Sequence, residues 1–175
     1  MIIIKSKQEI DIMREAGKVT GQVLKELEDF IKPGVSTMEI DSFVENFIRS
    51  KGMIPSFKGL YDFPGSACVS INEEVVHGIP SEDRILQEGD IVSLDIGVIH
   101  KGYHSDAART HAVGEISKEA KLLIERTRQS FFEGIKMAKE GNHLYDISNA
   151  IDAYISKFGY GIVRDLVGHG IGTEL

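Results

Sequence analysis

The chain has 175 residues, a length that suits one domain with a substantial hydrophobic core. Its net charge of −7 at pH 7, without a local basic cluster, gives no electrostatic footprint for nucleic acid or an anionic membrane. The single cysteine, Cys68, excludes an internal disulfide framework. It also fits a reducing compartment, and the apolar runs are too short for a signal peptide or a membrane span, so we expect a cytoplasmic protein.

Two amphipathic helices are predicted in the first third of the chain. The capping-box pattern Ser6-Lys7-Gln8-Glu9 opens the first, which ends before Lys32-Pro33-Gly34. The second starts near Ser36-Thr37 and stops at Lys51-Gly52. Each carries apolar residues at helical spacing: Ile10, Met13, Val23, Leu24, Leu27 and Ile31 in the first, and Ile40, Phe43, Val44, Phe47 and Ile48 in the second.

A β-hairpin is predicted over residues 91–110. Its first strand alternates between apolar and small or polar residues, which puts Asp95 on the polar face. If His100 and Lys101 form the turn, Asp95 lies directly opposite Asp106 on the returning strand. Aspartate is depleted in strands, and like charges across a ladder destabilise it.

The pair Asp95 and Asp106 is the strongest sign of chemistry in the sequence. At about 5 Å and an effective dielectric constant near 20, the two charges would repel by roughly 3 kcal/mol. A shared proton or a shared divalent cation would relieve that repulsion. Small neighbouring residues leave room for a ligand on the pair, so we predict a metal site. The alternative is a solvated hairpin face on which the carboxylates diverge.

Two further helices are predicted, and they resemble the first two. They run from Ser117 to about Gly141 and from about Leu144 to Gly159. Matched apolar positions alone are weak evidence for duplication, because any two amphipathic helices align in that way. The glycines at both ends also match without a gap, and this is the stronger argument. The matched positions are Gly34 with Gly141, Ile40 with Ile147, Val44 with Ile151, Phe47 with Tyr154, Ile48 with Ile155 and Gly52 with Gly159.

The duplication predicts about one and a half repeats within a single domain, 1–175. The first repeat covers about 1–113, and the second covers about 114–175 and is incomplete. Leu175 corresponds to Cys68 of the first repeat, so the counterpart of the hairpin that carries Asp95 and Asp106 would lie beyond the second repeat as given.

Two histidines are candidates for chemistry. Glycines flank His169 on both sides and leave its imidazole unobstructed, and imidazole is a good further metal ligand beside carboxylates. A structural histidine in a glycine turn is the alternative. His77, which precedes Gly78, could donate to a substrate near the metals or could be a packed, hydrogen-bonded side chain. We interpret Cys68 as a small apolar residue that could line a pocket.

Four motifs together resemble those of type I methionine aminopeptidases. They are Asn72-Glu73-Glu74-Val75-Val76-His77-Gly78-Ile79-Pro80, Gly89-Asp90-Ile91-Val92-Ser93-Leu94-Asp95-Ile96-Gly97, Asp106-Ala107-Ala108-Arg109-Thr110 and Gly168-His169-Gly170-Ile171-Gly172. The resemblance runs in order from Ile4 to Leu175. It implies the α+β pita-bread fold, with two pseudo-symmetric halves on a curved antiparallel sheet and, here, a truncated second half.

The resemblance also implies a site for two divalent metal ions, which are Co, Mn, Fe or Zn in the family. Asp95 would bind one ion, Asp106 would bridge both, and His169 would bind the other. His77 would contact the substrate and help to stabilise the reacting amide. The implied reaction removes an N-terminal methionine that precedes a small residue, by attack of a metal-activated hydroxide.

The implied partners are the N-termini of nascent polypeptides, with possible transient ribosome contact, no nucleic acid, no membrane and a monomeric enzyme. In the family, a further histidine and two glutamate ligands follow the region matched here. We therefore expect the 175 residues alone to bind metal weakly and to be inactive. Aromatic residues line the methionine pocket of the family, and the candidates here are Phe57, Tyr61, Phe63 and Cys68.

Two other functions compete with this interpretation. An X-Pro dipeptidase or X-Pro aminopeptidase would share the fold and the metal ligands, although such enzymes usually carry an extra N-terminal domain. A non-catalytic binding fragment on the same fold is the second alternative. Relatives of that kind generally lose the ligands, whereas Asp95, Asp106 and His169 are all present.

Overall fold

A computed structural model describes residues 3–175, which form two compact units. Unit 1 contains the chain up to Ile116 together with Gly170–Leu175, and unit 2 is Ser117–His169. The last six residues thus join the first unit, although the predicted second repeat includes them. Within residues 3–175, no helix is long and apolar enough to cross a membrane.

The core of unit 1 is an antiparallel sheet with β3 (Ile91–His100) in the middle. Strand β4 (Tyr103–Ala112) pairs along the whole of β3. The other edge of β3 pairs first with β2 (Ala67–Ile71) and further along with the short β1 (Ile54–Pro55). The α+β class and the antiparallel sheet predicted from the sequence are confirmed.

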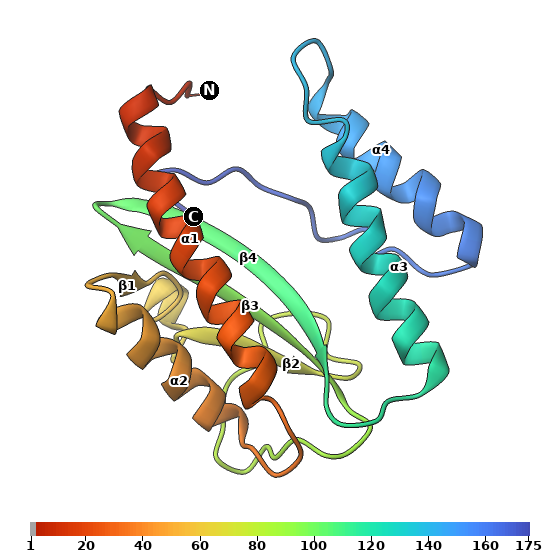
Figure 1. Ribbon diagram of the computed structural model, residues 1–175. Coiled ribbons are helices and arrows are strands. Elements are labelled where there is room, and N and C mark those ends of the chain that lie inside the picture. The colour runs from red at the N-terminus through yellow and green to blue at the C-terminus, as the bar shows by residue number, and fades with distance from the viewer. Residues whose placement is uncertain (1–2) are drawn as a thin grey trace. The chain divides into compact units, whose positions relative to one another are not determined.

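Helices α1 (Lys7–Phe30) and α2 (Thr37–Ser50) cover one face of this sheet (Figure 1). Both begin with the predicted capping boxes, in which a serine and the glutamate three residues later exchange hydrogen bonds. Their apolar stripes pack on the alternate, apolar residues of the strands. The fully buried residues of this core include Val23, Leu27, Ile40, Val44, Ile48, Val69, Leu86, Val92, Leu94, Ile96 and Val98. Ile10, by contrast, is exposed.

The hairpin of β3 and β4 has a different register from the predicted one. Residues Lys101 and Gly102 form the turn, and both have positive φ, 49° and 82°. A two-residue turn with two positive φ angles matches the twist of the strands, and glycine at its second position adopts that conformation without strain. The predicted turn at His100 and Lys101 is therefore wrong, because His100 still pairs with Tyr103.

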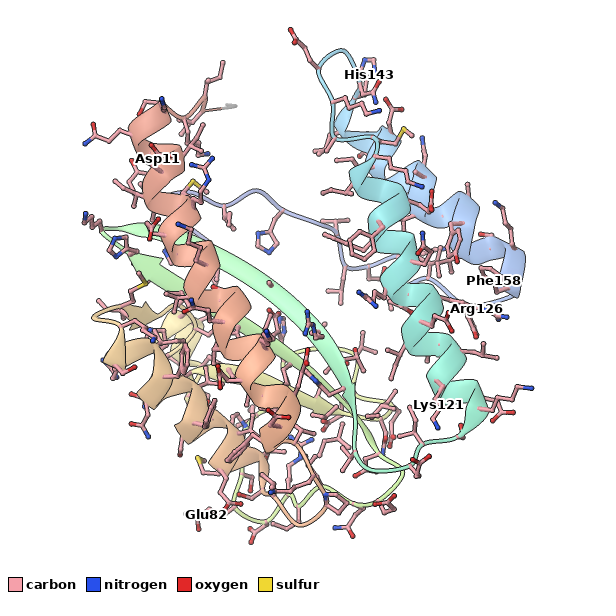
Figure 2. All side chains as sticks on the ribbon, viewed as in Figure 1. Asp11, Glu82, Lys121, Arg126, His143 and Phe158 are labelled. Carbon is pink, nitrogen blue, oxygen red and sulfur yellow. The ribbon has the colours of Figure 1, made fainter. Side chains whose placement is uncertain are left out.

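Unit 2 is a helical hairpin. Helix α3 (Lys118–Ile135) packs against α4 (Leu144–Ile155), which continues into the short helix η2 (Ser156–Phe158). A Cβ on Gly134 would lie only 2.8 Å from Ile151, so the glycine lets the helices approach closely. Arg126 of α3 lies over the ring of Phe158, 4.1 Å from its centroid (Figure 2).

Helix α3 is shorter than predicted. It was expected to reach Gly141, but after Ile135 the amides of Met137 and Ala138 bond to carbonyls only three residues back. Helix-continuing bonds are therefore lost immediately after Gly134, a residue of low helix propensity. Helix α4 begins at Leu144 as predicted, and with η2 it extends to the predicted end at Gly159.

The glycines at matched ends of α2 and α4 have nearly equal backbone angles. The φ angles of Gly34 and Gly141 are 91° and 89°, and those of Gly52 and Gly159 are 71° and 72°. Both helices also start at matched positions. In each, a carboxylate in the first turn accepts a hydrogen bond from the amide of the residue three positions earlier. These features support the predicted duplication, which stays a prediction.

Candidate metal centre

Asp95 and Asp106 lie on the same face of the sheet in unit 1. The register pairs Asp95 with Ala108 and Asp106 with Gly97, so the aspartates are diagonal neighbours and not directly opposite each other as predicted. This face, which we call the polar face, is the opposite one to the buried Val92, Leu94, Ile96 and Val98. Gly97 and Ala108 occupy the other two corners: the side chains of Ser56 and Phe57 lie against Gly97, and Ala108 contributes only a methyl group.

The diagonal arrangement changes the size of the repulsion but not its sign. At the roughly 7 Å that separates diagonal pairs, and with an effective dielectric constant near 20, the two charges repel by about 2 kcal/mol. Both side chains are only partly buried. A cation held by both carboxylates, or a proton shared between them, would relieve this repulsion.

Cys68 borders the carboxylates on the neighbouring strand, where it pairs with Asp95. Burial, together with the negative charges of Asp95 and Asp106, raises the pKa of the Cys68 thiol to about 12. The thiol therefore stays protonated at neutral pH and acts neither as a nucleophile nor as a ready metal ligand. Its interpretation as a small apolar residue that lines a pocket fits these surroundings.

Gly97 makes room for the segment that follows β1. A Cβ on Gly97 would lie 2.7 Å from Cε1 of Phe57 and 2.6 Å from Cβ of Ser56. The Ser56 amide donates to the Gly97 carbonyl at 2.9 Å. The buried ring of Phe57 thus lies against the residue paired with Asp106. An isolated glycine in a strand pattern signals such an approach, so the sequence contained a sign of this contact.

The four residues predicted to line the methionine pocket have different surroundings. Phe57 and Cys68 are buried beside the aspartates, and Phe63 is partly buried. Tyr61 has positive φ and is 93% exposed, so it has the least support as part of the wall.

His104 is a neighbour of the pair that the sequence did not single out. It lies on the polar face two residues before Asp106, and its Nδ1 is 3.0 Å from Oγ of Ser56. Burial lowers the pKa of His104, and the negative charge of Asp106 partly opposes that effect. Its position in the alternation of β4 is the signal that could have identified it.

His77 lies at the outer edge of β2. The Val69 amide donates to the Gly78 carbonyl at 2.9 Å, and the Gly78 amide donates to Oγ of Ser70 at 3.1 Å. A Cβ on Gly78 would lie 2.1 Å from the Val69 carbonyl oxygen, so only glycine fits there. His77 itself has a φ of 58° and is exposed, which contradicts the alternative of a packed core histidine.

His169 is the last residue of unit 2, and its side chain is exposed. Three residues later the chain joins the sheet of unit 1, where the His104 amide donates to the Gly172 carbonyl at 2.8 Å. The glycine-rich segment is therefore anchored on β4 two residues before Asp106. Whether His169 is a ligand stays a prediction.

The residues on the polar face fit a hard or borderline divalent cation. Two carboxylates supply up to four oxygen atoms, which is the donor chemistry of Mn²⁺, Fe²⁺ or Co²⁺ sites that also use imidazole. Within residues 3–175, no three His, Cys, Asp or Glu side chains are close enough together to surround an ion. Asp95 and Asp106 can thus hold a cation together only if other groups supply the remaining ligands.

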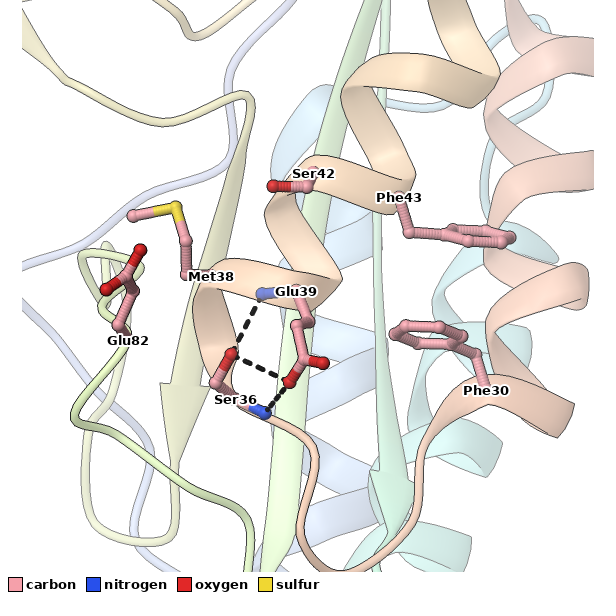
Figure 3. A pocket seen from close by; sticks show the side chains of 7 residues that line it. All are labelled: Phe30, Ser36, Met38, Glu39, Ser42, Phe43 and Glu82. Atoms are coloured by element: carbon pink, nitrogen blue, oxygen red, sulfur yellow. Dashed lines mark hydrogen bonds between the residues drawn. The ribbon is translucent and has the colours of Figure 1, made fainter.

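A separate groove of about 570 Å³ lies between the end of α1 and the start of α2 (Figure 3). Stacked Phe30 and Phe43 and the side chain of Met38 supply its apolar part. One of its two glutamates, Glu39, already accepts hydrogen bonds from Ser36 in the capping box. None of the predicted site residues lines this groove, and it does not belong to the candidate metal centre.

Sequence comparison relates nearly the whole chain to metallopeptidases. The model of metallopeptidase family M24 matches residues 11–175. A methionine aminopeptidase of Clostridium acetobutylicum is 57% identical over 175 residues, which are 100% of this chain and 70% of that protein. Methionine aminopeptidase 1 of Bacillus subtilis is 50% identical over the same shares of the two chains.

Solved structures show the same relationship at the level of the fold. Methionine aminopeptidase from Thermotoga maritima has a TM-score of 0.97 and 40% identity, and the match covers 99% of this chain and 70% of that enzyme. The enzyme from Rickettsia prowazekii has a TM-score of 0.96 and 40% identity, and the match covers 99% of this chain and 69% of that enzyme. An Xaa-Pro dipeptidase from Bacillus anthracis has a TM-score of 0.83 and 32% identity, and this chain covers only 47% of it.

Proposed function

We infer the function from the family to which the chain belongs: it is a member of metallopeptidase family M24 and, within it, a methionine aminopeptidase. The pita-bread fold and the metal-dependent hydrolase class follow from that membership. The X-Pro alternative is not favoured, because the dipeptidase is less similar in sequence and in structure than the methionine aminopeptidases.

We propose that the reaction takes place on the polar face of unit 1. The observation that carries this proposal is the diagonal placement of Asp95 and Asp106 on one face of the sheet, beside the buried Phe57 and Cys68. In the proposed roles, Asp95 would hold one divalent ion, His169 would hold a second and Asp106 would contribute to both. The bound ions would polarise the scissile carbonyl and lower the pKa of a water molecule.

The remaining residues of the site would bind and orient the substrate. Phe57, Phe63 and the protonated thiol of Cys68 give an apolar wall beside the carboxylates, which suits the unbranched thioether of methionine. The exposed His77 can donate a hydrogen bond to the substrate and help to stabilise the reacting amide. The fixed contact of Gly78 with β2 would hold this imidazole beside the strand that carries Cys68.

The substrates we propose are N-terminal methionines of newly made polypeptides that precede a small residue. Two ions, drawn from Co, Mn, Fe or Zn, would occupy the complete site. Transient ribosome contact and a monomeric state stay predictions. The 175 residues contain three proposed protein ligands, which is few for two ions, so we predict weak metal binding and little turnover for them alone.

The test is methionine release from Met-Ala-Ser with added Mn²⁺ or Co²⁺, with Ala-Pro as the competing substrate. We would assay the chain alone and the chain joined to the part of the Clostridium acetobutylicum protein that it does not cover. The joined protein should release methionine, and Asp106→Asn should reduce the rate at least 100-fold because the bridging carboxylate is lost. Cleavage of Ala-Pro in preference to Met-Ala-Ser, or an active Asp106→Asn variant, would contradict the proposal.

A further inference from the structure

The segment from Ser56 to Cys68 borders the candidate metal centre at both of its ends. At one end Ser56 and Phe57 lie against Gly97, and at the other Cys68 pairs with Asp95. The proposed wall beside the carboxylates is therefore part of a single segment. Its position decides how much space a substrate side chain finds next to Asp95 and Asp106.

The middle of this segment has little structure of its own. Gly59, Tyr61 and Asp62 have φ angles of 85°, 48° and 63°, and the short helix η1 (Leu60–Asp62) is distorted at Tyr61. Tyr61 is 93% exposed and adds no packing to the core. A loop with positive φ at non-glycine residues keeps such a conformation only when its surroundings impose it.

Two carboxylates of α2, one turn apart, supply that constraint. Oδ1 of Asp41 accepts hydrogen bonds from the amides of Ser66 and Ala67, at 2.6 and 2.9 Å. Oε2 of Glu45 accepts from Nζ of Lys58 at 2.6 Å and from Oγ of Ser66 at 3.1 Å. Both ends of the distorted stretch are thus attached to the same face of α2.

Asp41 is an unusual residue for this place in the core. It is only 5% exposed, and a Cβ on Gly65 would lie 3.0 Å from its Oδ1, so the loop backbone approaches it closely. Burial raises the pKa of Asp41, while the amide bonds from Ala67 and Ser66 act in the opposite direction. A buried carboxylate is costly, and an apolar residue of similar size would often stabilise the fold as well or better. Its bonds to the loop are what an apolar residue could not supply.

We propose that Asp41 is a positioning residue for the methionine-binding wall: by holding the amides of Ser66 and Ala67, it fixes Cys68 beside Asp95 and the segment 56–68 over the polar face. Glu45 assists through Lys58 and Ser66. The inference rests on the proposed function for the identity of the bound side chain. The placement of the segment itself is independent of that function.

The single thiol of the chain allows a direct test. Cys68 is buried, so a thiol reagent such as dithionitrobenzoate reacts with it only when the segment opens. In the 175-residue chain, Asp41→Ala should speed labelling at least tenfold. Asp41→Asn should stay within about twofold of the wild type, since its Oδ1 still accepts both amides.

Glu39→Ala is the matched control, because Glu39 is on the same helix and its side chain, within residues 3–175, accepts hydrogen bonds from Ser36 and none from the loop. The Glu39→Ala variant should have a less stable helix α2, but its Cys68 should not be labelled faster than that of the wild type under native conditions. The inference would be overturned if Asp41→Ala labelled at the wild-type rate, if Asp41→Asn labelled as fast as Asp41→Ala, or if Glu39→Ala did so.

A second readout separates positioning from mere stability. In the joined protein with Mn²⁺ present, Met-Ala-Ser should protect Cys68 from labelling, and half-protection should need about tenfold more peptide in Asp41→Ala but not in Glu39→Ala. An equal requirement in Asp41→Ala and the wild type would overturn the positioning role. No protection in the wild type would count against the proposed function, and the labelling rates would still decide whether Asp41 holds the segment.

Discussion

Helices α2 and α4 begin with similar local signals but differ in what covers them. Each starts after a glycine of nearly equal φ and carries isoleucine or valine at matched positions. In α2 the residues Ile40, Val44 and Ile48 are fully buried against the sheet of unit 1. In α4 the counterparts Ile147 and Ile151 are only partly buried within the helical hairpin of unit 2, and of the three counterparts Ile155 alone is buried.

The difference shows that capping and apolar spacing decide whether a helix forms, whereas the layer beneath it decides what its apolar face contributes to stability. Unit 1 has a sheet under its helix pair. Unit 2 has only the contact of α3 with α4, made close by Gly134. Exposed Leu144 and Tyr145 at the start of α4 reflect the thinner core.

The largest effect should come from replacing an isoleucine by alanine at matched positions of α2 and α4. Ile40→Ala should destabilise unit 1 by about 3 kcal/mol, because it leaves a cavity in a fully buried site. Ile147→Ala should cost unit 2 about 1 kcal/mol, since Ile147 is already partly exposed. Hydrogen exchange of amides in α2 and α4 would measure the two effects separately. Equal losses would show that the two helices are covered to the same degree.

The next effect concerns a buried histidine that only unit 1 has. His111 is 9% exposed, and its Nε2 has no hydrogen-bond partner within the described residues. Burial, with a smaller effect of the nearby Arg109, lowers the pKa of His111 from 6.5 to about 4, while Glu28 acts in the opposite direction. The folded state therefore binds fewer protons than the unfolded state between these values.

Because the pKa is depressed on folding, stability should fall as the pH drops from about 6.5 towards 4. His111 should account for a loss of up to about 3 kcal/mol in unit 1. Urea unfolding of the wild type and of His111→Gln over this range isolates the contribution, because the variant cannot titrate. A His111→Gln variant with the wild-type slope would exclude this effect.

The smallest effect concerns the helix caps. In α2, Oγ of Ser36 accepts from the Glu39 amide at 3.1 Å, and Glu39 accepts from the Ser36 amide at 2.7 Å (Figure 3). In α4, the Asp146 carboxylate accepts from the His143 amide at 2.8 Å, but the His143 side chain makes no cap bond. Ser36→Ala should cost about 1 kcal/mol and His143→Ala only a few tenths. Similar costs in thermal unfolding would contradict this reading of the caps.

Much of the fold could be predicted because its signals are local. Capping residues, glycines and apolar spacing located all four helices, and alternation located β3 and its polar face. The end of α3 was missed because Gly134 serves the contact with α4, a tertiary reason that spacing does not reveal. The hairpin register was missed because the choice between turn residues depends on which two can both adopt positive φ.

The site was predictable in its residue types more than in its geometry. Asp95 and Asp106 were selected for being acidic in strands, and both lie on one face, although diagonally. The contacts of Phe57 with Gly97 and of Asp41 with Ser66 and Ala67 join segments that are far apart in the chain. Such contacts depend on the packed fold, and no pattern in one sequence fixes them.

The most direct test of the metal centre is a calorimetric titration of the 175-residue chain with Mn²⁺. The wild type should bind the ion weakly, and Asp106→Asn should bind it at least tenfold more weakly, because one of the two paired carboxylates becomes a neutral amide. Asp83→Asn, at an exposed acid of the same unit, should behave like the wild type. Binding that is absent from the wild type, or unchanged in Asp106→Asn, would contradict the assignment of the metal to the Asp95 and Asp106 pair.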